Sequence, residues 1–272
     1  MPSDDKRNGG GTLPSPLVSV VVPIYNLAPY LMRGVNSLMN QTYRNLQLIL
    51  VDDHSTDDSK TVIEQAADQD PRIEPIYLPA NRGVSAARNA GLAQARGLYV
   101  AFMDGDDWMA PHLIARFVAA LEAGPYDILV SPFYTDNPTP GALPHRTARS
   151  KVLSRRQFLS GMLAPVGYLR GYLWNKFYRR SVIESAHLQF DEQVALMEDE
   201  LFNTQYALAA SRFYYLGEPA YHHVVRRDST TQSLGVIGAL PKQLAALWRI
   251  AGLIRTSYQT GTVPEEPVRS ER

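Results

Sequence analysis

Between residues 17 and 103, apolar runs of strand length alternate with segments of helical character. The runs are Leu17–Pro23, Leu46–Val51, Arg72–Leu78 and Leu98–Met103, and helical segments begin near Pro29, Lys60 and Val84. The first run, LVSVVVP, is β-branched and apolar on both faces, which is typical of a buried parallel strand. Because helices connect the strands, the pattern predicts an α/β fold with a parallel sheet that is covered on both faces.

Three polar motifs each follow one of these apolar runs: Pro23–Asn26, Asp52–Ser55 and Asp104–Asp107. In sheets of this kind, ligands bind beyond the carboxyl ends of the strands. Each motif alone could be an ordinary loop. Three of them at one edge of a sheet predict a ligand site.

The third motif lies in the stretch FMDGDDWM, where three carboxylates repel one another within four residues. Paired carboxylates suit a hard divalent cation such as Mg²⁺ or Mn²⁺, and Gly105 would let backbone or ligand approach closely. For an isolated DGD, a surface turn is the simpler explanation. A calcium EF-hand is excluded because Trp108 and Met109 replace the required Asp or Asn and Gly. An aspartyl-phosphate phosphatase is disfavoured because its aspartate pair usually follows the first strand.

Composition excludes several other classes. Lys and Arg total 27, as do Asp and Glu, so no basic excess exists for nucleic acid. Cysteine is absent, which excludes disulfides, thiolate zinc sites and cysteine nucleophiles. The longest apolar runs are far shorter than the roughly 20 residues of a membrane-spanning helix, and the N-terminal segment lacks the apolar stretch of a signal peptide. We therefore expect a cytoplasmic protein.

We expect four parts along the chain: a disordered tail (1–16), an α/β domain (17–235), an amphipathic helix (236–258) and a disordered tail (259–272). The helix is indicated by apolar residues at helical spacing: Leu244, Leu247, Trp248, Ala251 and Ile254. Within the domain, Pro132–Ser150 is rich in Pro, Thr and Ala and is expected to be a mobile loop. Ser154 and Gln157 form a capping box that predicts a helix up to Leu163.

Six segments occur in the order VSVVVPIYN, VDDHSTDDS, NRGVSAARNAGLAQARG, FMDGDDW, LWNKFYRR and MEDELF. Together they resemble the family-2 glycosyltransferases, inverting enzymes with the GT-A fold, and the resemblance extends from Leu17 to Gln232. It implies a Rossmann-like, mostly parallel central sheet flanked by helices, with a C-terminal helical appendage. It also implies transfer of a sugar from a nucleotide donor, most simply a UDP-sugar, to a hydroxyl of a glycan or polyprenyl-linked acceptor in surface polysaccharide synthesis.

The resemblance assigns donor binding to the first two strand ends. Pro23, Tyr25 and Asn26 match the segment that surrounds the nucleotide. Asp53 matches the aspartate that bonds uracil, and a carboxylate can accept the imide N–H. His54 stands where the family usually has glycine.

The next matching segment contains Gly83 and Arg88, which the resemblance places beside the nucleotide. Two interpretations of Arg88 remain equal. It could face the diphosphate of the donor, or it could brace the acidic loop through an ion pair.

The resemblance assigns metal binding to the DxD signature, with Mn²⁺ or Mg²⁺ as the cofactor. Asp106 then binds the metal, and Asp104 contacts the ribose or the metal. His223 matches a third metal ligand of related GT-A enzymes, with His222 as the alternative.

Inversion requires a base that takes a proton from the acceptor hydroxyl. In MEDELF, three acids begin a predicted helix, where acids commonly interact with the helix dipole. The resemblance selects Asp199 as the base, with Glu198 as the second choice. It assigns acceptor binding to Trp174, for which a buried structural role is the alternative. Lys176 is expected to contact phosphate or acceptor, or to be a solvated charge.

Two other functions are disfavoured by the sequence. A sugar-phosphate nucleotidyltransferase normally has a glycine-rich loop with a basic residue after the first strand, where this chain has PIYNLAPY. A non-catalytic scaffold that binds nucleotide sugars is disfavoured by the intact acids at 104, 106 and 199. The C-terminal helix could contact a membrane surface, the catalytic domain or a second subunit.

Overall fold

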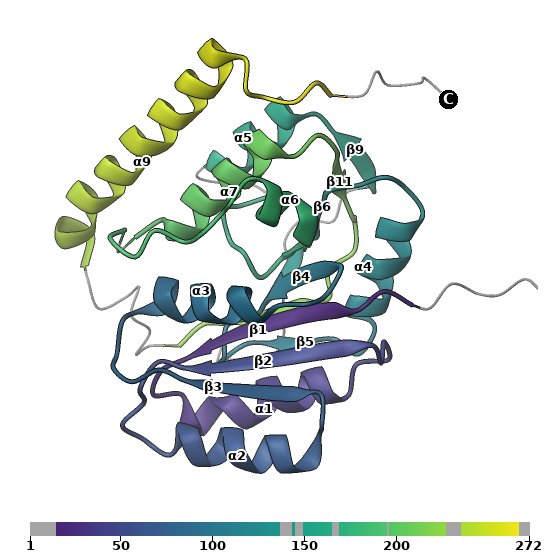
Figure 1. Ribbon diagram of the computed structural model, residues 1–272, viewed down its shortest axis with the longest axis vertical. Helices are drawn as coiled ribbons and strands as arrows, with labels where there is room; N and C mark the ends of the chain where they lie inside the picture. The colour runs from purple at the N-terminus through teal and green to yellow at the C-terminus, as the bar shows by residue number, and fades with distance from the viewer. Residues whose placement is uncertain are drawn as a thin grey trace, which may run out of the picture.

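Two sheets organise the protein in the computed structural model, which describes residues 15–136, 143–144, 149–164, 169–194, 196–226 and 235–266 (Figure 1). The larger sheet has the strand order β3-β2-β1-β4-β10-β6-β11-β9, and the smaller has the order β5-β12-β7-β8. The strands are β1 (Val18–Ile24), β2 (Leu46–Asp52), β3 (Ile73–Tyr77), β4 (Tyr99–Phe102), β5 (Trp108–Met109), β6 (Ile128–Val130), β7 (Phe133–Asp136), β8 (Leu143–Pro144), β9 (Lys151–Leu153), β10 (Lys176–Arg179), β11 (Phe213–Tyr215) and β12 (Tyr221–Val224).

Helices cover both faces of the larger sheet (Figure 1). They are α1 (Ala28–Met39), α2 (Ser59–Gln69), α3 (Val84–Gln94), α4 (Leu113–Glu122), α5 (Arg155–Leu163), α6 (Arg180–Ser185), α7 (Glu198–Ala209) and α9 (Gly235–Thr260). The apolar residues of α1, α2 and α4 share one core, and those of α3, α5, α6 and α7 share the other. The sequence prediction of an α/β sheet buried on both faces is therefore confirmed.

The first four strands of the larger sheet pair in parallel, as the alternation of strand and helix predicts. Along β1, Val20 and Val22 point into the core with α1 and α2, whereas Val21 points into the core with α3. A strand that is apolar at every position fits this environment because neither face meets water.

The second half of the larger sheet is mixed. Strand β10 lies antiparallel between β4 and β6, and β9 is antiparallel at the edge. The sequence did not indicate β10, because LWNKFYRR contains three basic residues, which are not typical of a buried strand. The mixed order places the segment before β10 close to the carboxyl ends of the parallel strands.

The smaller sheet corrects one expectation. Pro132–Ser150 was expected to be a mobile loop, but β7 and β8 lie within it, and β7 pairs with β12 in parallel. Residues 137–142 and 145–148 lie outside the described residues. Tyr221–Val224 in β12 joins β7 to β5, so this sheet packs the chain's late residues against the acidic loop.

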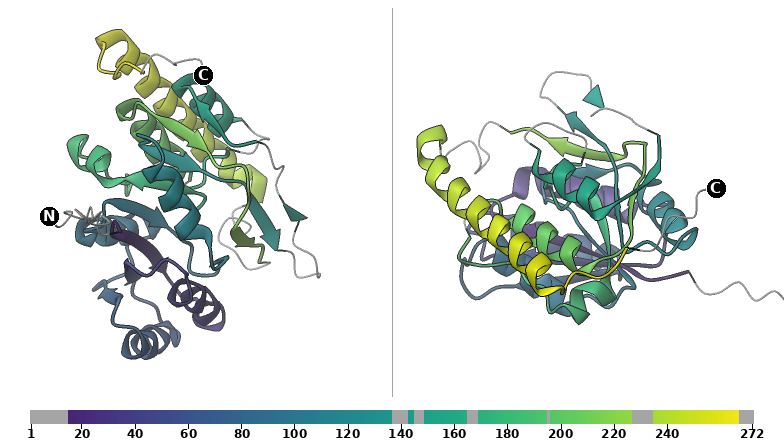
Figure 2. Two further views of the ribbon diagram at one scale, coloured as in Figure 1. Left: turned by 90° about the vertical axis from the view of Figure 1, so that its right-hand side faces the viewer. Right: turned by 90° about the horizontal axis from the view of Figure 1, so that it is seen from above.

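Helix α9 lies on the outside of the molecule and packs against α7 (Figures 1 and 2). It begins at Gly235 and ends at Thr260, so it extends two residues beyond the prediction. Residues 261–266 belong to the segment that was expected to be disordered, yet Pro264 and Glu266 contact the buried Arg155. The first fourteen residues and 267–272 lie outside the described part.

Candidate active site

The ends of β1 and β2 meet through hydrogen bonds, as their position on the parallel sheet predicts. The Asn26 backbone N–H donates to Ser55 Oγ at 3.0 Å, and the Thr56 N–H donates to Asn26 Oδ1 at 2.8 Å. Asn26 has a φ of 52°, which its short side chain tolerates. The Tyr25 side chain beside it is 47% exposed, so it is available to a ligand.

Asp53 is buried and holds the turn that precedes α3. Its two carboxylate oxygens accept the backbone N–H groups of Arg82 at 2.8 Å and Gly83 at 2.7 Å. Gly83 has a φ of 87°, a conformation that favours glycine. Each carboxylate oxygen has a second lone pair, so Asp53 retains the capacity to accept a further N–H. The structure therefore brings Asp53 and Gly83 together.

His54 occupies the position where the family usually has glycine, and its φ is 62°. The left-handed region costs a residue with a Cβ atom about 1–2 kcal/mol. The turn accepts the side chain by leaving it exposed.

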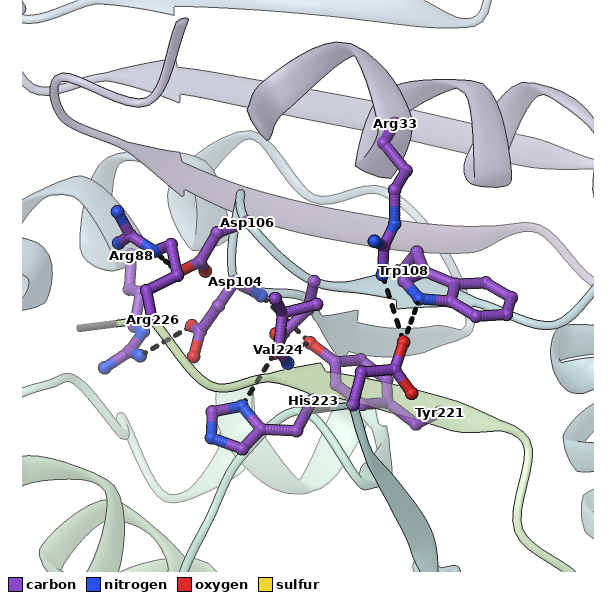
Figure 3. Close-up of polar contacts among 11 residues, drawn as sticks. Arg33, Arg88, Asp104, Asp106, Trp108, Tyr221, His223, Val224 and Arg226 are labelled. Atoms are coloured by element: carbon purple, nitrogen blue, oxygen red, sulfur yellow. Dashed lines mark hydrogen bonds and ion pairs between the residues drawn. The ribbon is translucent and has the colours of Figure 1, made fainter. Parts of the chain in front are cut away.

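Arg88 lies buried between two groups of carboxylates, and Figure 3 shows it near the first group, Asp104 and Asp106. Its Nη1 contacts Asp199 Oδ1 at 2.7 Å and Glu198 Oε1 at 3.1 Å, and its Nη2 contacts Asp104 Oδ1 at 3.3 Å. These acids raise the pKa of Arg88, so the guanidinium stays charged despite its burial. Of the two interpretations left open, the structure favours the ion-pair brace.

The acidic loop is held by residues from β12. Asp107 accepts the hydroxyl of Tyr221 at 2.8 Å and the N–H of Val224 at 2.7 Å, and its Oδ2 lies 3.3 Å from Nδ1 of His223 (Figure 3). Burial raises the pKa of Asp107 to about 6, although His223 opposes the shift. Arg226, which follows β12, donates to Asp106 at 2.6 Å.

Gly105 lies where β1 ends. A Cβ atom there would approach Leu27 Cδ1 to 2.8 Å and the Pro23 carbonyl oxygen to 3.3 Å. The absence of a side chain therefore lets the acidic loop pack on the end of β1. This contact explains Gly105 without a ligand, whereas the sequence left backbone or ligand approach open.

The described residues contain no cluster of three or more His, Asp or Glu side chains arranged to hold a metal. Mg²⁺ commonly needs only one or two protein carboxylates, because waters and substrate phosphates complete its coordination. Asp104 and Asp106 supply such a pair. His223 contacts Asp107 through Nδ1, and the structure does not bring it together with Asp104 and Asp106 as the predicted third metal ligand. The donor set therefore fits a hard dication that binds together with a diphosphate.

His222 does not fit the alternative role of metal ligand. Its ring stacks on Trp108 at 3.5 Å, and its Nδ1 lies 3.0 Å from Asp136 Oδ1. The Trp108 indole N–H and Arg33, which Figure 3 labels, also bind Asp136, so His222, Trp108, Arg33 and Asp136 form a network beside the acidic loop.

Asp199 lies in the first turn of α7, two residues after Met197, which has a φ of 64°. Burial raises the pKa of Asp199 well above its ordinary value, while Arg88 opposes this shift and favours the ionised form. A carboxylate whose pKa is raised by burial is better suited to accept a proton than a solvated one. Glu198 shares the Arg88 nitrogen, so the structure keeps both candidate bases in one place.

Trp174 does not fit the predicted contact with an acceptor sugar. It is 2% exposed, and its ring stacks between Tyr172 at 4.7 Å and Tyr221 at 4.5 Å. Both ring faces are therefore covered, and the structural alternative holds. Lys176 is likewise buried, and its Nζ donates to backbone carbonyls rather than to a ligand or solvent.

Sequence reasoning missed two contributors to the site, Tyr221 and Arg226. Tyr221 supports both Asp107 and the backbone N–H of Asp104 through its hydroxyl. Arg226 binds Asp106 from more than one hundred residues away along the chain. In the sequence, Arg226 lies three residues after His223, which was a predicted site residue. This proximity was the only sequence signal that could have indicated a role for Arg226.

Comparison with known proteins identifies the family. The sequence profile described as Glycosyl transferase family 2 matches residues 19–186. The chain is 34% identical over 219 residues to the uncharacterized glycosyltransferase EpsJ of Bacillus subtilis. The aligned region covers 80% of this chain and 63% of EpsJ. It is 31% identical to EpsH of the same bacterium, with the same coverage of both chains.

The structure resembles that of S. aureus TarS in complex with UDP-GlcNAc, with a TM-score of 0.69, 24% identity and coverage of 80% of this chain and 61% of TarS. This similarity shows the fold. The chain spans about three fifths of the length of these relatives. The profile matches more than half of the chain, and its segment contains the strand-end motifs, Arg88 and the acidic loop. The chain belongs to glycosyl transferase family 2 and has the GT-A fold.

Proposed function

We propose that this protein transfers a sugar from a UDP-sugar, with inversion, to a hydroxyl group of a glycan or lipid-linked acceptor during surface polysaccharide synthesis. One observation carries the proposal. The guanidinium of Arg88 contacts Asp104 at 3.3 Å and Asp199 at 2.7 Å, so one side chain joins the acidic loop to the predicted base. A donor bound at the acidic loop would then have its anomeric carbon near Asp199.

The donor would bind along the edge formed by Pro23, Tyr25, Asn26, Asp53 and Gly83. The remaining lone pairs of Asp53 would accept the imide N–H of uracil. The similarity to TarS, whose structures contain UDP and UDP-GlcNAc, supports a uridine nucleotide.

Asp104 and Asp106 are the groups that would hold Mn²⁺ or Mg²⁺, with waters and the donor diphosphate as the other ligands. When bound, the ion would offset the negative charge that develops on the departing UDP. Arg226 already contacts Asp106 and would contribute a second positive charge at this position.

Asp199 would act as the general base. Its carboxylate removes the proton of the acceptor hydroxyl while that oxygen attacks the anomeric carbon on the face opposite the nucleotide. The bond from the anomeric carbon to the diphosphate oxygen breaks, and UDP leaves with the bonding electrons. This single displacement inverts the anomeric configuration.

The test compares Asp199→Asn with the intact protein. Loss of the base is expected to lower kcat by about 10²- to 10⁴-fold. UDP affinity should stay within about twofold, since Asp199 belongs to no donor contact. Glu198→Gln, the matched variant at the same Arg88 nitrogen, should retain much more turnover. Activity is identified beforehand by screening hydrolysis of nucleotide sugars with and without Mn²⁺ or Mg²⁺.

Full turnover in Asp199→Asn would refute its role as the base. A protein that binds UDP but transfers no sugar in any condition would instead be a scaffold. Transfer that continues in excess chelator would remove the metal from the proposal.

The outer face of α9 supports a membrane contact as part of this function. Trp248 is 78% exposed, and the exposed apolar residues beside it are Leu240, Leu244, Leu247 and Tyr258. The sequence of α9 contains three basic residues and no acidic one, although the whole chain has equal numbers of each. A helix with this charge complements an anionic lipid surface on the cytoplasmic membrane face. Among the described residues, no helix is long and apolar enough to cross a membrane.

Vesicle sedimentation tests this contact with Trp248→Ser and with Val152→Ser as the control, because Val152 is an exposed apolar residue, at 47%, on β9 rather than on α9. Binding to anionic vesicles should fall about tenfold or more in Trp248→Ser and stay unchanged in Val152→Ser. Equal binding of all three proteins would refute the membrane contact. A concentration-dependent dimer that Trp248→Ser abolishes would assign this face to a second copy instead.

A further inference from the structure

Each carboxylate of the acidic loop has a basic partner from a distant part of the chain. The pairs are Asp104 with Arg88 of α3, Asp106 with Arg226, and Asp107 with His223 of β12. Three like charges within four residues repel one another, and these partners offset that repulsion within the folded chain itself. A dication that binds the loop must therefore compete with basic side chains of the protein.

The competition is strongest at Asp106. Arg226 Nε lies 2.6 Å from Asp106 Oδ2, whereas Arg88 Nη2 lies 3.3 Å from Asp104 Oδ1 (Figure 3). The Asp106 side chain is also the better shielded of the two, at 17% exposed against 34% for Asp104. Water and salt screen a shielded ion pair less than an exposed one. Separating Asp106 from its partner is therefore the costlier step for a metal that binds both aspartates.

Arg226 is also held from the side of α1. Its guanidinium carbon lies 4.7 Å from the ring centroid of Tyr30, and its side chain is only 15% exposed. A shielded charge that loses its partner destabilises the structure, because no water replaces the lost contact. Arg226 will therefore release Asp106 readily only if another anion takes the place of that carboxylate.

A free dication brings no such anion. It would share Asp106 with the guanidinium, and two positive groups would repel each other at one carboxylate. A nucleotide diphosphate does bring phosphate oxygens, and a guanidinium binds phosphate through charge-assisted hydrogen bonds. The exchange is balanced when dication and diphosphate arrive together, because Asp106 then keeps a cation and Arg226 keeps an anion.

We propose that Arg226 is the resident partner of Asp106 and makes metal binding depend on the donor. It excludes Mn²⁺ or Mg²⁺ from Asp106 while the nucleotide is absent, and it turns to the diphosphate when the two bind together. The inference deepens the proposed function and rests on it in one respect, since it takes Asp106 as a metal ligand.

The experiment measures the Mn²⁺ affinity of the full chain by the spin-resonance signal of free Mn²⁺, with and without UDP. In Arg226→Gln, Mn²⁺ affinity without UDP should rise about tenfold or more, because Asp106 has lost its charged competitor. The gain in Mn²⁺ affinity on adding UDP should be at least about fivefold smaller than in the intact protein. The Mn²⁺–UDP complex that forms in solution is the same for every protein, so it cancels in this comparison.

Two further variants separate the contact from charge in general. Arg226→Lys keeps the positive charge beside Asp106, so it should keep the low Mn²⁺ affinity of the intact protein without UDP. Arg33→Gln is the matched control, because Arg33 pairs with Asp136 beside the acidic loop at 3.1 Å and touches neither DxD aspartate. Its Mn²⁺ affinity should stay within about twofold of the intact value, since salt screens an exposed charge.

Equal Mn²⁺ affinity of the intact protein and Arg226→Gln without UDP would overturn the exchange, as would Mn²⁺ binding to neither. An equal rise in Arg33→Gln would also overturn it, by assigning the effect to net charge. The proposed function is tested by the other arm, because an intact protein that binds no UDP would contradict it. A rise of Mn²⁺ affinity confined to Arg226→Gln would still support Arg226 as the partner that keeps metal from Asp106.

Discussion

The donor region (residues 18–107) and the acceptor region (residues 169–226) hold their site residues in different ways. In the donor region, strand ends and tight turns place the side chains, as in the backbone contacts of Asn26 and Asp53. In the acceptor region, buried side chains do this work, as in the Lys176 contacts and the stacked rings around Trp174. The regular geometry of parallel strands explains the first arrangement, whereas the second depends on how buried side chains pack once the chain has folded.

The difference predicts how each region responds to change. A substitution in the donor region should act locally, because neighbouring backbone groups hold each residue. A substitution in the acceptor region removes partners from several elements at once. Arg88 belongs to both regions, because it lies on α3 in the donor region and forms an ion pair with Asp199 on α7 in the acceptor region.

Arg88→Met should produce the largest effect, because it leaves Asp104, Asp199 and Glu198 without their shared cation. Breaking a buried ion pair on one side costs about 3–5 kcal/mol of folding free energy. Urea unfolding at neutral pH measures this loss. Lys60→Met, which removes an exposed partner of Glu64, is the control and should change stability little.

The deficit of Arg88→Met should shrink as the pH falls. Burial raises the pKa values of Asp104 and Asp199, so acid neutralises them in the folded protein before it does so in the unfolded chain. Neutral carboxyl groups no longer need the guanidinium. A deficit that stays constant down to about pH 5 would show that the two regions are not coupled through these charges.

Lys176→Met tests the acceptor region by its pH dependence. Burial lowers the pKa of Lys176 to about 7 from its ordinary value of 10.5. Above pH 7 the unfolded chain therefore binds one more proton, so the stability of the intact protein should rise by about 1.4 kcal/mol per pH unit up to about pH 10. The variant lacks this rise.

The measurement is the difference in unfolding free energy between the two proteins from about pH 7.5 to 9.5, where other groups titrate equally in both. Parallel curves would contradict the prediction. They would mean that the surrounding carbonyl oxygens keep Lys176 charged across this pH range. The hydrogen bonds from its ammonium group would then hold the acceptor region at every pH tested.

Asp53→Asn tests the donor region. The substitution replaces an acceptor oxygen by an amide N–H₂ group beside the backbone N–H of Arg82 or Gly83. Leaving one buried donor unsatisfied should cost about 1–3 kcal/mol, and UDP binding should weaken as well. Asp58→Asn is the control, because Asp58 makes no side-chain cap at the start of α2. Changes in acceptor-region dynamics on Asp53→Asn, measured by amide exchange, would contradict the local character of this region.

His54→Gly should have the smallest effect, and it should be favourable. Removal of the Cβ atom relieves the left-handed conformation, while the freer unfolded chain offsets part of the gain, so stability should rise by about 0.5–1 kcal/mol. Thermal unfolding measures the change. His112→Gly, at a φ of −103°, should instead lose stability. A loss of stability in His54→Gly would show that the His54 side chain makes a contact that stabilises the fold by more than the left-handed backbone conformation costs.

The sequence predicted the donor region well. Alternating strands and helices, and polar residues at three strand ends, correctly indicated that Asn26, Asp53 and Asp104 share one edge of the sheet. The capping box at Ser154 and Gln157 is present as expected. These features depend on residues that are close in sequence, or on the regular geometry of parallel strands.

The acceptor region escaped prediction for a physical reason. Trp174 is an amphipathic residue whose ring stacks on Tyr172 and on Tyr221 of β12, and Lys176 is a charged residue that donates to backbone carbonyl oxygens and to the Asn175 side chain. Their sequence neighbours do not reveal whether carbonyl oxygens or solvent surround the ammonium group. Strand β12 has the sequence YHHV, and its pairing with β5 and β7 is set by tertiary contacts. A residue's role here is fixed only after the chain has folded.

Arg155 has a mechanical consequence. Its guanidinium joins the carbonyl oxygens of Ala207 and Ala210, at the end of α7, to that of Pro264. Tension on the chain after α9 would therefore be carried by the far end of the helix whose first turn holds Asp199. A rigid helix transmits such a load along its axis, so a pull on the residues after α9 would also reach the first turn of α7, which holds the proposed base Asp199.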